Sequence, residues 1–468
     1  MRIAVYTNIL RVTVLARRCA AYMEEPEVCV CPVSGMDDWN AMRADADLHL
    51  FLWMGTGLDN DFLKKASRNL QRNRTPHLIV VDNADHDKVT YGFSEEQIQT
   101  AWAYFRYDGE ENMRNLFYWL GREFGGLACT AEPPRPLAWN GVYHPDWTGD
   151  PEDIAGYLAS HYEEGRPTVG MIFYRSEWIT RDFTYHTALV RAIEAEGMNA
   201  VAVFSNSYRD ERVESPTLMD AIRKYFCRDG EPFVDVIIST MKFSIKAGGT
   251  RIEDLYELGV PILEAYTVLA QKEEWERSPA GLDPMEVSMS VAMPEFDGVI
   301  HAVPIAAKVR DESGAISYAA LDERMKRITR KARKWAALRH KPNAEKKIAI
   351  VFHNYPPTNA NIGSAAGLDS PESVLRLLTA MRAAGYVMDE IPESSKAFMK
   401  LLTDHATNDR RFMSAAQAKS ADGQLTAEQY RAFFTELPAQ VRSQLVRDWG
   451  DEPGDVLSYD GTLLIPGT

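Results

Sequence analysis

The segment TVGMIFY (168–174) is the clearest strand in the sequence, because seven mostly apolar residues stand there between polar turns. Three further apolar runs follow at intervals of about 25–35 residues: AVAVF (200–204), VDVIIST (234–240) and VPILEA (260–265). Helical stretches separate these runs. The alternation predicts right-handed βαβ crossovers and a parallel, doubly wound sheet in a domain that covers residues 131–340.

The carboxyl ends of these strands are where a sheet of this kind binds ligands. The residues that follow the strands are Arg175, Ser176, Glu177 and Trp178, then Ser205, Asn206, Ser207 and Tyr208, then Lys242. We therefore expect ligand contacts along this edge of the sheet.

The N-terminal part of the chain shows the same rhythm. Its apolar runs are IAVY (3–6), LHLFLWM (48–54) and HLIVVD (77–82), with helical stretches between and after them. The segment EPPRP (132–136) cannot continue a helix or a central strand, which predicts a linker close to it. We expect an N-terminal α/β domain over residues 1–130.

A basic stretch ends the middle domain. Between residues 324 and 347 there are eleven Lys or Arg and one acidic residue, Glu345. The helical spacing of four apolar residues predicts an amphipathic helix over 324–340 whose buried stripe consists of Met325, Ile328, Trp335 and Leu338. Its basic face is either a simple solvated surface or a docking surface for an acidic partner or ligand.

A third α/β unit is predicted over residues 341–468. It opens with the strand-like KKIAIVF (346–352) and continues through a helix that starts near Ser370, a good N-cap residue. It closes on TLLIPGT (462–468), a strand-like run that nothing follows and that we expect to be unpaired. The predicted fold class is therefore α/β, with successive doubly wound parallel-sheet domains of the flavodoxin-like or Rossmann-like kind, the last of them incomplete.

Composition excludes several classes of partner. The 468 residues include 52 Lys or Arg against 67 Asp or Glu, a net charge of −15, so we expect no nucleic-acid or anionic-membrane partner. No apolar run approaches the roughly 18 residues that span a bilayer. Five cysteines, an odd number in a long chain, favour a reducing compartment, and we expect a cytoplasmic protein.

Common motifs of nucleotide-binding proteins and of hydrolases are absent from the sequence. It contains no GxxxxGK[ST] motif and no GxGxxG after a strand, and HExxH and GxSxG are missing as well. The sequence therefore predicts no ATP site in this chain. If the process consumes ATP, another polypeptide must hydrolyse it.

The richest candidate site is the loop FHNYPPTNANIGSAAGLDS (352–370). It joins a predicted strand to a predicted helix and is much longer than the usual ~2–6 residues of such a loop. Its asparagines and small residues offer many hydrogen-bond donors and acceptors, which suits carboxylate or carboxamide substituents. The alternative is an ordered turn without a ligand.

A second candidate is MPEFDG (293–298). Glu295 and Asp297 flank an aromatic residue and are able to hold a metal ion or take a proton, although such a pair also caps turns. The ten histidines are scattered, and no pair has metal-ligand spacing.

Four stretches carry a resemblance to a known family. They are the long segment KKIAIVFHNYPPTNANIGSAAGLDSPESVLRLLTAMRAAGY (346–386), TVGMIFYRS (168–176), VAMPEFDGVI (291–300) and RHKPNAEKK (339–347). The segment 346–386 resembles the large subunit of cobaltochelatase (CobN) and, more distantly, the H subunit of magnesium chelatase. The other three fit the same family, and the match is collinear from about His144 to the end.

The resemblance implies ATP-dependent insertion of a divalent metal into a tetrapyrrole. In the cobalt branch, cobalt is the substrate ion and the ring is a corrin of the hydrogenobyrinic acid a,c-diamide type, an intermediate of cobalamin biosynthesis. The large subunit binds the ring, while partner AAA+ ATPase motor subunits hydrolyse ATP. The alternatives are a magnesium or nickel chelatase subunit acting on a porphyrin-type ring, or a non-catalytic tetrapyrrole-binding module.

The family's large subunits run to well over twice this length. This chain therefore resembles an N-terminal portion of them, and we expect it to be inactive alone.

Position and chemistry suggest a role for each candidate residue. Metal insertion needs a base for the ring N–H protons and a transient metal ligand, so we assign His353 to both roles. Glu295 is the second catalytic candidate, and Glu295 and Asp297 would escort the cation. The expected substrate-binding residues are Tyr174, Arg175, Asn354, Tyr355, Asn359, Asn361, Gly363, Ser364, Asp369, Ser370 and Ser373.

Overall fold

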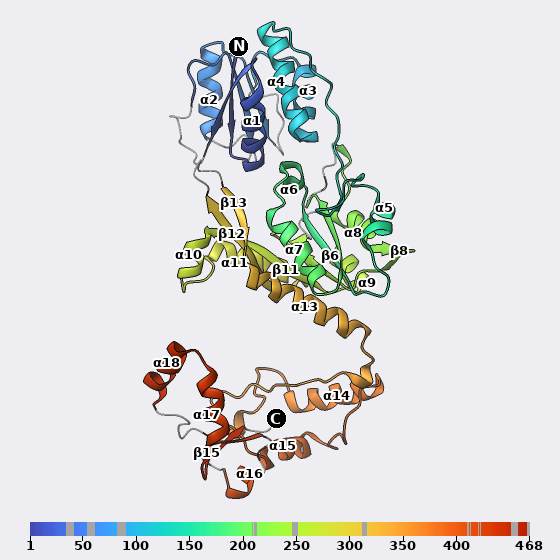
Figure 1. Ribbon diagram of the computed structural model, residues 1–468, viewed down its shortest axis with the longest axis vertical. Coiled ribbons are helices and arrows are strands. Elements are labelled where there is room, and N and C mark those ends of the chain that lie inside the picture. Colours follow the sequence, from blue (N-terminus) through green and yellow to red (C-terminus); the bar gives the residue numbers. More distant parts are fainter. Residues whose placement is uncertain are drawn as a thin grey trace. The chain divides into compact units, whose positions relative to one another are not determined.

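The computed structural model divides the chain into two compact units, Met1–Arg339 and His340–Thr468 (Figure 1). The residues that it describes are 1–33, 42–53, 61–81, 90–207, 209, 213–245, 251–310, 316–409, 411, 413–419, 421, 423–450 and 457–465. None of the helices in these ranges is long and apolar enough to cross a membrane.

The first unit begins with a parallel sheet. Its four strands, in the order in which they pair, are β2 (Glu27–Pro32), β1 (Arg2–Thr7), β3 (Leu48–Trp53) and β4 (His77–Val81). The helices of this part are α1 (Leu10–Tyr22), α2 (Asp61–Arg72), α3 (Glu95–Tyr107) and α4 (Glu110–Gly125).

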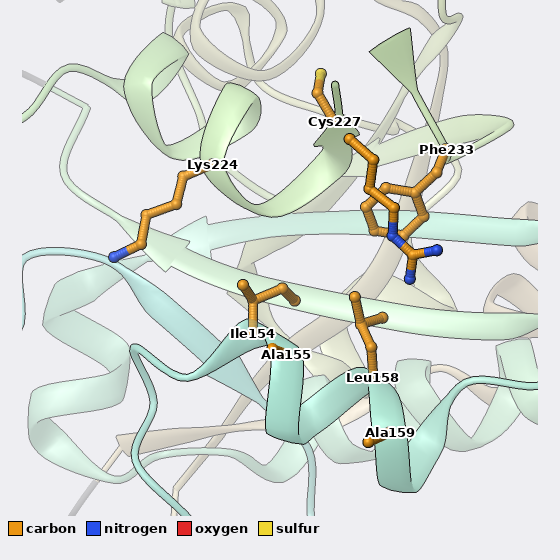
Figure 2. Close-up of a pocket in the computed structure, with 8 residues that line it drawn as sticks. Ile154, Ala155, Leu158, Ala159, Lys224, Cys227 and Phe233 are labelled. Atoms are coloured by element: carbon orange, nitrogen blue, oxygen red, sulfur yellow. The ribbon is translucent and has the colours of Figure 1, made fainter. Parts of the chain in front are cut away.

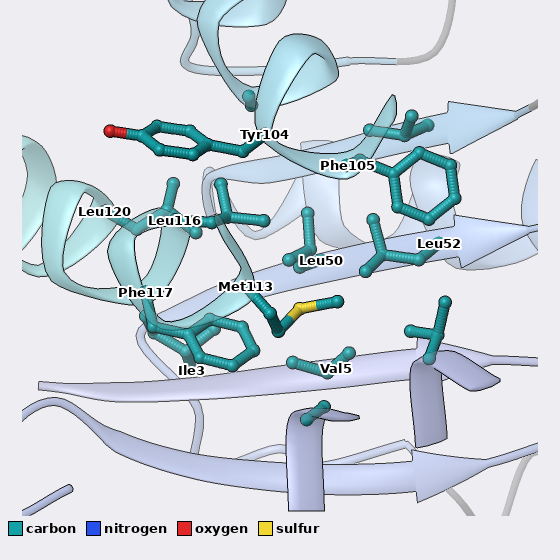
Figure 3. Close-up of a cluster of buried hydrophobic side chains, with 14 of the residues drawn as sticks. Ile3, Val5, Leu50, Leu52, Tyr104, Phe105, Met113, Leu116, Phe117 and Leu120 are labelled. Atoms are coloured by element: carbon teal, nitrogen blue, oxygen red, sulfur yellow. The ribbon is translucent and has the colours of Figure 1, made fainter. Parts of the chain in front are cut away.

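Strand alternation explains how the helices divide between the two faces of this sheet. Ile3 and Val5 point to one face and pack with residues of α1, α3 and α4, among them Met113 (Figure 3). Ala4 and Tyr6 point to the other face and pack with Phe62 and its neighbours on α2. Both faces are covered, which is why the strands are apolar throughout.

A second sheet follows in the same unit. Its seven strands, in pairing order, are β13 (Ile316–Ala320), β12 (Ile300–Arg310), β11 (Ile262–Gln271), β10 (Val236–Ser239), β6 (Thr168–Tyr174), β7 (Asn199–Ser205) and β5 (Gly141–Tyr143). The five inner strands are parallel and the two edge strands are antiparallel. The predicted α/β class with parallel sheets is confirmed.

Helices cover both faces of the second sheet as well. Residues of α7 (Thr184–Ala195) and α13 (Asp322–His340) pack on one face, and residues of α8 (Leu218–Phe226) and α9 (Ile252–Leu258) pack on the other. The shorter elements are α5 (Ile154–His161), α6 (Arg175–Thr180), α10 (Lys272–Arg277), α11 (Pro284–Val287), a π-helical turn (Ser288–Ala292), α12 (Met293–Glu295) and the ribbon of β8 (Cys227–Arg228) with β9 (Glu231–Pro232).

The strand order of this sheet reverses between β6 and β10. From β6 the chain passes to β7 on one side, and β10, β11 and β12 then add on the other side. Crossovers on opposite sides of this point leave a gap at the carboxyl ends of the two strands, which is the position where doubly wound sheets bind ligands.

The basic helix is α13, which ends at His340. Met325 and Ile328 are buried as expected, whereas Leu338 is 41% exposed. The small residues Ala332 and Ala336 complete the buried stripe instead.

The second unit corrects two expectations about strands. Residues 346–352 form no strand, and Ile348 and Val351 are 53% and 82% exposed. An apolar run becomes a strand only where a neighbouring strand hydrogen-bonds with it, and no described strand lies beside this one. The TLLI run is not unpaired, because β16 (Thr462–Ile465) pairs with β14 (Gly423–Thr426) and β15 (Ser458–Tyr459) in an antiparallel sheet.

The helices of the second unit surround only a small core. They are α14 (Ser370–Ala383), α15 (Ser395–Asp404), α16 (Ala415–Lys419), α17 (Ala427–Glu436) and α18 (Ala439–Trp449), with short 3₁₀ turns at Asn343–Glu345 and Asn359–Asn361.

The predicted domain boundary near residue 130 stays a prediction, because both parallel sheets belong to one compact unit.

Candidate functional site

The loop 353–370 is held in shape mainly by its own polar groups. The Gly363 N–H donates to the His353 carbonyl at 2.8 Å. The Asn361 side-chain nitrogen donates to the Pro356 carbonyl at 2.9 Å, and the Thr358 N–H donates to Asn354 Oδ1 at 3.3 Å. The asparagines predicted to hold substrate therefore use part of their hydrogen-bonding capacity to build the loop.

Gly363 is required by the path of the chain. Its φ of +71° lies in the left-handed region, and an added Cβ would lie 2.5 Å from Cδ1 of the Phe352 ring. The Phe352 ring in turn packs against Phe398 of α15, with 5.8 Å between ring centroids. Gly363 thus shapes the loop and offers no side chain to a ligand.

Asn359 connects the loop to a segment that the sequence analysis did not single out. The Asn359 N–H donates to Asp409 Oδ2 at 3.0 Å, and the Thr407 hydroxyl donates to Asn359 Oδ1 at 2.6 Å. Arg411 makes a two-pronged ion pair with Asp409, both bonds being 2.9 Å. Hydrogen bonds from Arg411 and from the Asn359 N–H hold the pKa of the Asp409 carboxyl well below its usual range.

The start of α14 is capped by Asp369, which corrects the prediction that Ser370 is the N-cap residue. Asp369 Oδ1 accepts the Glu372 N–H at 3.0 Å, and the Ser373 hydroxyl donates to the Asp369 carbonyl at 2.6 Å. Ser370 is buried in the first turn. An aspartate has a better-placed acceptor here, one residue earlier, so the chain itself already satisfies donors at this helix end.

The exposed side chains of the loop are those that remain for a ligand. His353, Ser364 and Tyr355 are exposed, Tyr355 by 74%. Among the described residues, none hydrogen-bonds with the His353 imidazole or the Tyr355 hydroxyl. The loop therefore presents an imidazole, a phenol and a hydroxyl on a backbone fixed from within.

The candidate pair Glu295 and Asp297 does not act as a unit. Glu295 is exposed at the end of α12, whereas Asp297 is 3% exposed. Asp297 accepts hydrogen bonds from the Ser244 hydroxyl at 2.8 Å and from the Ile245 N–H at 2.5 Å, so it anchors the loop after β10. Within the described ranges, no group of three or more His, Cys, Asp or Glu side chains is placed to hold a metal ion.

Arg175 is part of the scaffold rather than of an open surface. Its side chain is buried and donates to the carbonyls of Ala138 and Tyr107 at 2.8 and 3.1 Å, and it lies over the Trp139 ring at 4.4 Å. Burial lowers the pKa of this guanidinium to about 10. Arg175 thus ties the segment after residue 130 to the second sheet.

A polar network lies at the carboxyl ends of β6 and β10, the edge where the sequence predicts ligand contacts, and it includes Tyr185 and His186, which sequence reasoning missed. Glu177 accepts hydrogen bonds from the Tyr185 hydroxyl at 2.6 Å and from the Tyr174 N–H at 3.2 Å, and it lies 3.1 Å from His186 Nε2. The Tyr174 hydroxyl donates to the Lys242 carbonyl at 2.8 Å. The available signal was a Glu three residues after the end of β6 and a Tyr-His pair in the first turn of α7.

The first unit also has an apolar hollow of about 440 Å³ (Figure 2). Helix α5 supplies Ile154 and Leu158 on one side, and Cys227 and Phe233 lie opposite them. Burial raises the pKa of the Cys227 thiol, which keeps it protonated and unreactive at neutral pH. The hollow therefore contains no evident catalytic group.

A family model and individual proteins of known sequence point to the same family. The CobN/Magnesium Chelatase family model matches residues 102–468. An uncharacterized protein of Methanocaldococcus jannaschii is 38% identical over 379 residues, covering 78% of this chain and 30% of that protein. The aerobic cobaltochelatase subunit CobN of Pseudomonas aeruginosa is 28% identical over 378 residues, covering 80% of this chain and 29% of that protein.

A solved structure shares the fold. The catalytic subunit of cobaltochelatase from Mycobacterium tuberculosis superposes with a TM-score of 0.58 at 23% sequence identity, covering 99% of this chain and 37% of that one. The chain thus spans about 30% of the length of the curated relatives that it matches.

Proposed function

Because the chain belongs to the CobN/magnesium chelatase family, we propose that it is part of the tetrapyrrole-binding large subunit of a metal chelatase, a ligase that forms nitrogen–metal bonds. The observation that carries this proposal beyond the family is the loop 353–370. Its backbone is fixed by internal hydrogen bonds, while His353 and Tyr355, two residues apart in sequence, are exposed. A fixed loop with an exposed imidazole and aromatic ring suits a flat macrocycle that must lose protons.

Within this function, His353 is the base that accepts the ring N–H protons. Histidine is the side chain that most often acts as a general base, because one nitrogen of its neutral imidazole accepts a proton. The Tyr355 ring, 74% exposed, would stack on the macrocycle. The hydrogen bonds within the loop do not use the side-chain nitrogen of Asn354 or the side-chain oxygen of Asn361. These two atoms would hydrogen-bond with polar substituents of the ring.

We further propose that the ring is a corrin of the hydrogenobyrinic acid a,c-diamide type and that cobalt is the metal substrate, in cobalamin biosynthesis. Identity to CobN supports this choice. The absence of a P-loop from the sequence supports ATP hydrolysis by AAA+ partner subunits. Five free cysteines support a cytoplasmic location.

Absorbance titration of the chain with the corrin and with a porphyrin tests binding and ring preference. We expect the corrin to bind and His353→Ala to leave that binding within about twofold, because a base contributes to the reaction more than to affinity. His340→Ala, an exposed histidine at the end of α13, is the matched control. No spectral change with either ring would contradict the proposal.

Metal insertion is then measured with the complete set of chelatase subunits, ATP and cobalt. We expect His353→Ala to lower the insertion rate by about 10²–10⁴-fold, the usual contribution of a general base. An unchanged rate would remove His353 from the chemistry. Preference for magnesium and a porphyrin would indicate a magnesium chelatase subunit, and binding without insertion would indicate a non-catalytic module.

A further inference from the structure

The point where the strand order of the second sheet reverses holds two polar side chains with unused hydrogen-bonding capacity. Lys242 follows β10 by three residues, and Glu264 on β11 is paired in register with Ser239, the last residue of β10. Lys242 lies close enough to lower the pKa of Glu264. The two side chains therefore form one cluster at the carboxyl end of the sheet.

Glu264 is buried without a partner. Its residue is 1% exposed, and neither carboxyl oxygen makes a hydrogen bond with any described residue. The Ser239 hydroxyl is near enough to favour the charged form slightly, but burial dominates and raises the pKa of Glu264 well above its usual value. Burial thus favours the neutral carboxylic acid, which has one O–H donor and one C=O acceptor.

Lys242 is the more accessible member. It is partly exposed, and its ammonium makes no hydrogen bond or ion pair with the residues that the structure describes. Its backbone is well fixed, since Tyr174 donates to its carbonyl and the neighbouring Phe243 N–H donates to the Met289 carbonyl at 2.8 Å.

The charges that surround Lys242 are balanced. Lys308 is the second basic side chain nearby, and Glu177 and Glu286 are the two other acidic side chains. Glu177 is satisfied by the hydrogen bonds described above, and Glu286 accepts the Leu269 N–H at 2.5 Å. Two basic and two acidic side chains thus surround this point, so a charged ligand would add an unbalanced charge in a poorly solvated place.

We propose that this cluster binds a neutral carboxamide group of a small molecule. A carboxylic acid and a primary amide form two parallel hydrogen bonds, with the Glu264 O–H donating to the amide oxygen and the amide N–H donating to the Glu264 carbonyl. The Lys242 ammonium donates to the second lone pair of the amide oxygen. The inference does not depend on the chelatase function proposed above.

Saturation-transfer NMR of the complete chain with propionamide and propionate tests the proposal. The two probes have nearly the same shape and differ in charge and in N–H donors. At pH 7 we expect propionamide to bind saturably and propionate to bind at least about tenfold more weakly, a difference of about 1.4 kcal/mol. Equal binding of the two probes would overturn the proposal.

Three variants locate the site. Glu264→Gln keeps a neutral donor and acceptor and should retain propionamide binding within about threefold, whereas Glu264→Leu and Lys242→Met should each weaken it by about tenfold or more. Lys224→Met, an exposed lysine of α8 outside the cluster, should change nothing. Binding that survives Glu264→Leu unchanged would overturn the proposal.

Infrared spectroscopy gives a readout that is independent of affinity. A protonated Glu264 should show the carbonyl band of a carboxylic acid at pH 7, which Glu264→Gln abolishes and which propionamide shifts in the wild-type chain. This measurement requires only that the variant folds, as Glu264→Gln preserves volume and neutrality. Absence of the acid band at pH 7 would overturn the proposal.

Discussion

Replacing Gly363 by alanine should destabilise the second unit strongly, because two independent penalties coincide at this residue. Its φ of +71° costs an L-residue about 1–2 kcal/mol. The new Cβ would also lie 2.5 Å from the Phe352 ring, which is itself packed on Phe398. Such overpacking costs about 1–3 kcal/mol, so the free energy of unfolding should fall by about 2–5 kcal/mol.

Gly367 provides the matched control four residues away. Its φ of +74° carries the same backbone cost, but nothing lies within 4 Å of its added Cβ. Gly367→Ala should therefore cost about 1–2 kcal/mol only. The difference between the two variants measures the ring contact alone, at about 1–3 kcal/mol.

Hydrogen exchange of the complete chain in increasing urea, followed by mass spectrometry, gives the measurement. Peptides from residues 340–468 report the second unit, and peptides from β6 serve as an internal reference that should not change. Equal destabilisation by the two variants would refute the reasoning about Phe352. Because the Gly363 N–H donates to the His353 carbonyl, Gly363→Ala should also weaken tetrapyrrole binding more than Gly367→Ala does.

Three further predictions concern other parts of the chain. Arg175→Lys should lower the free energy of unfolding of the first unit by about 2–4 kcal/mol, measured in urea titrations, because a lysine cannot hydrogen-bond with several backbone carbonyls at once. Weaker ligand binding at unchanged stability would instead indicate that Arg175 contacts the substrate. On α13, Arg324, Arg327 and Lys334 line a groove of about 680 Å³ and make no ion pair with a described residue. Reversing all three charges to Glu should abolish association with the proposed AAA+ partner, whereas the same change at Lys65, Arg68 and Arg72 of α2 should not. Equal effects of the two sets of variants in pull-down assays would exclude the groove as the docking surface. Asp409, with its lowered pKa, stabilises the folded state above the ordinary aspartate value of about 3.9, and this contribution disappears as the pH falls below that value. Asp409→Asn should therefore lower the free energy of unfolding at pH 7 and reduce the loss of stability between about pH 4 and pH 2. Asp404→Asn, on the surface of α15, should do neither and serves as the control. An unchanged dependence of stability on pH in Asp409→Asn would refute the argument.

Local patterns were sufficient to predict the parallel sheets. Runs such as TVGMIFY are apolar at every position because helices cover both faces of the strand, and this property is written in consecutive residues. The run at 346–352 has a similar pattern and forms no strand. Strand formation depends on a partner elsewhere in the chain, and a local apolar pattern contains no information about that partner.

The same limit applies to the candidate sites. Asp297 and Glu295 look equivalent in sequence, yet Ser244 and Ile245, more than fifty residues earlier in the chain, bury one and leave the other exposed. The loop 353–370 was found because its length and asparagine content are local properties. Its division into residues that build the loop and residues that face outward depends on pairings such as that of Gly363 with His353.

The local sequence pattern around Glu264 does not indicate a binding site. In VPILEA a glutamate near the end of an apolar run resembles the polar residue that ordinarily ends a strand. The strand β11 instead continues to Gln271, and pairing with Ser239 places Glu264 in the interior of the sheet. A buried acid without a hydrogen-bond partner lowers stability, and chains retain such groups mainly where they serve a function. The physical cost of Glu264 is therefore itself an argument that a ligand with a complementary donor and acceptor binds there.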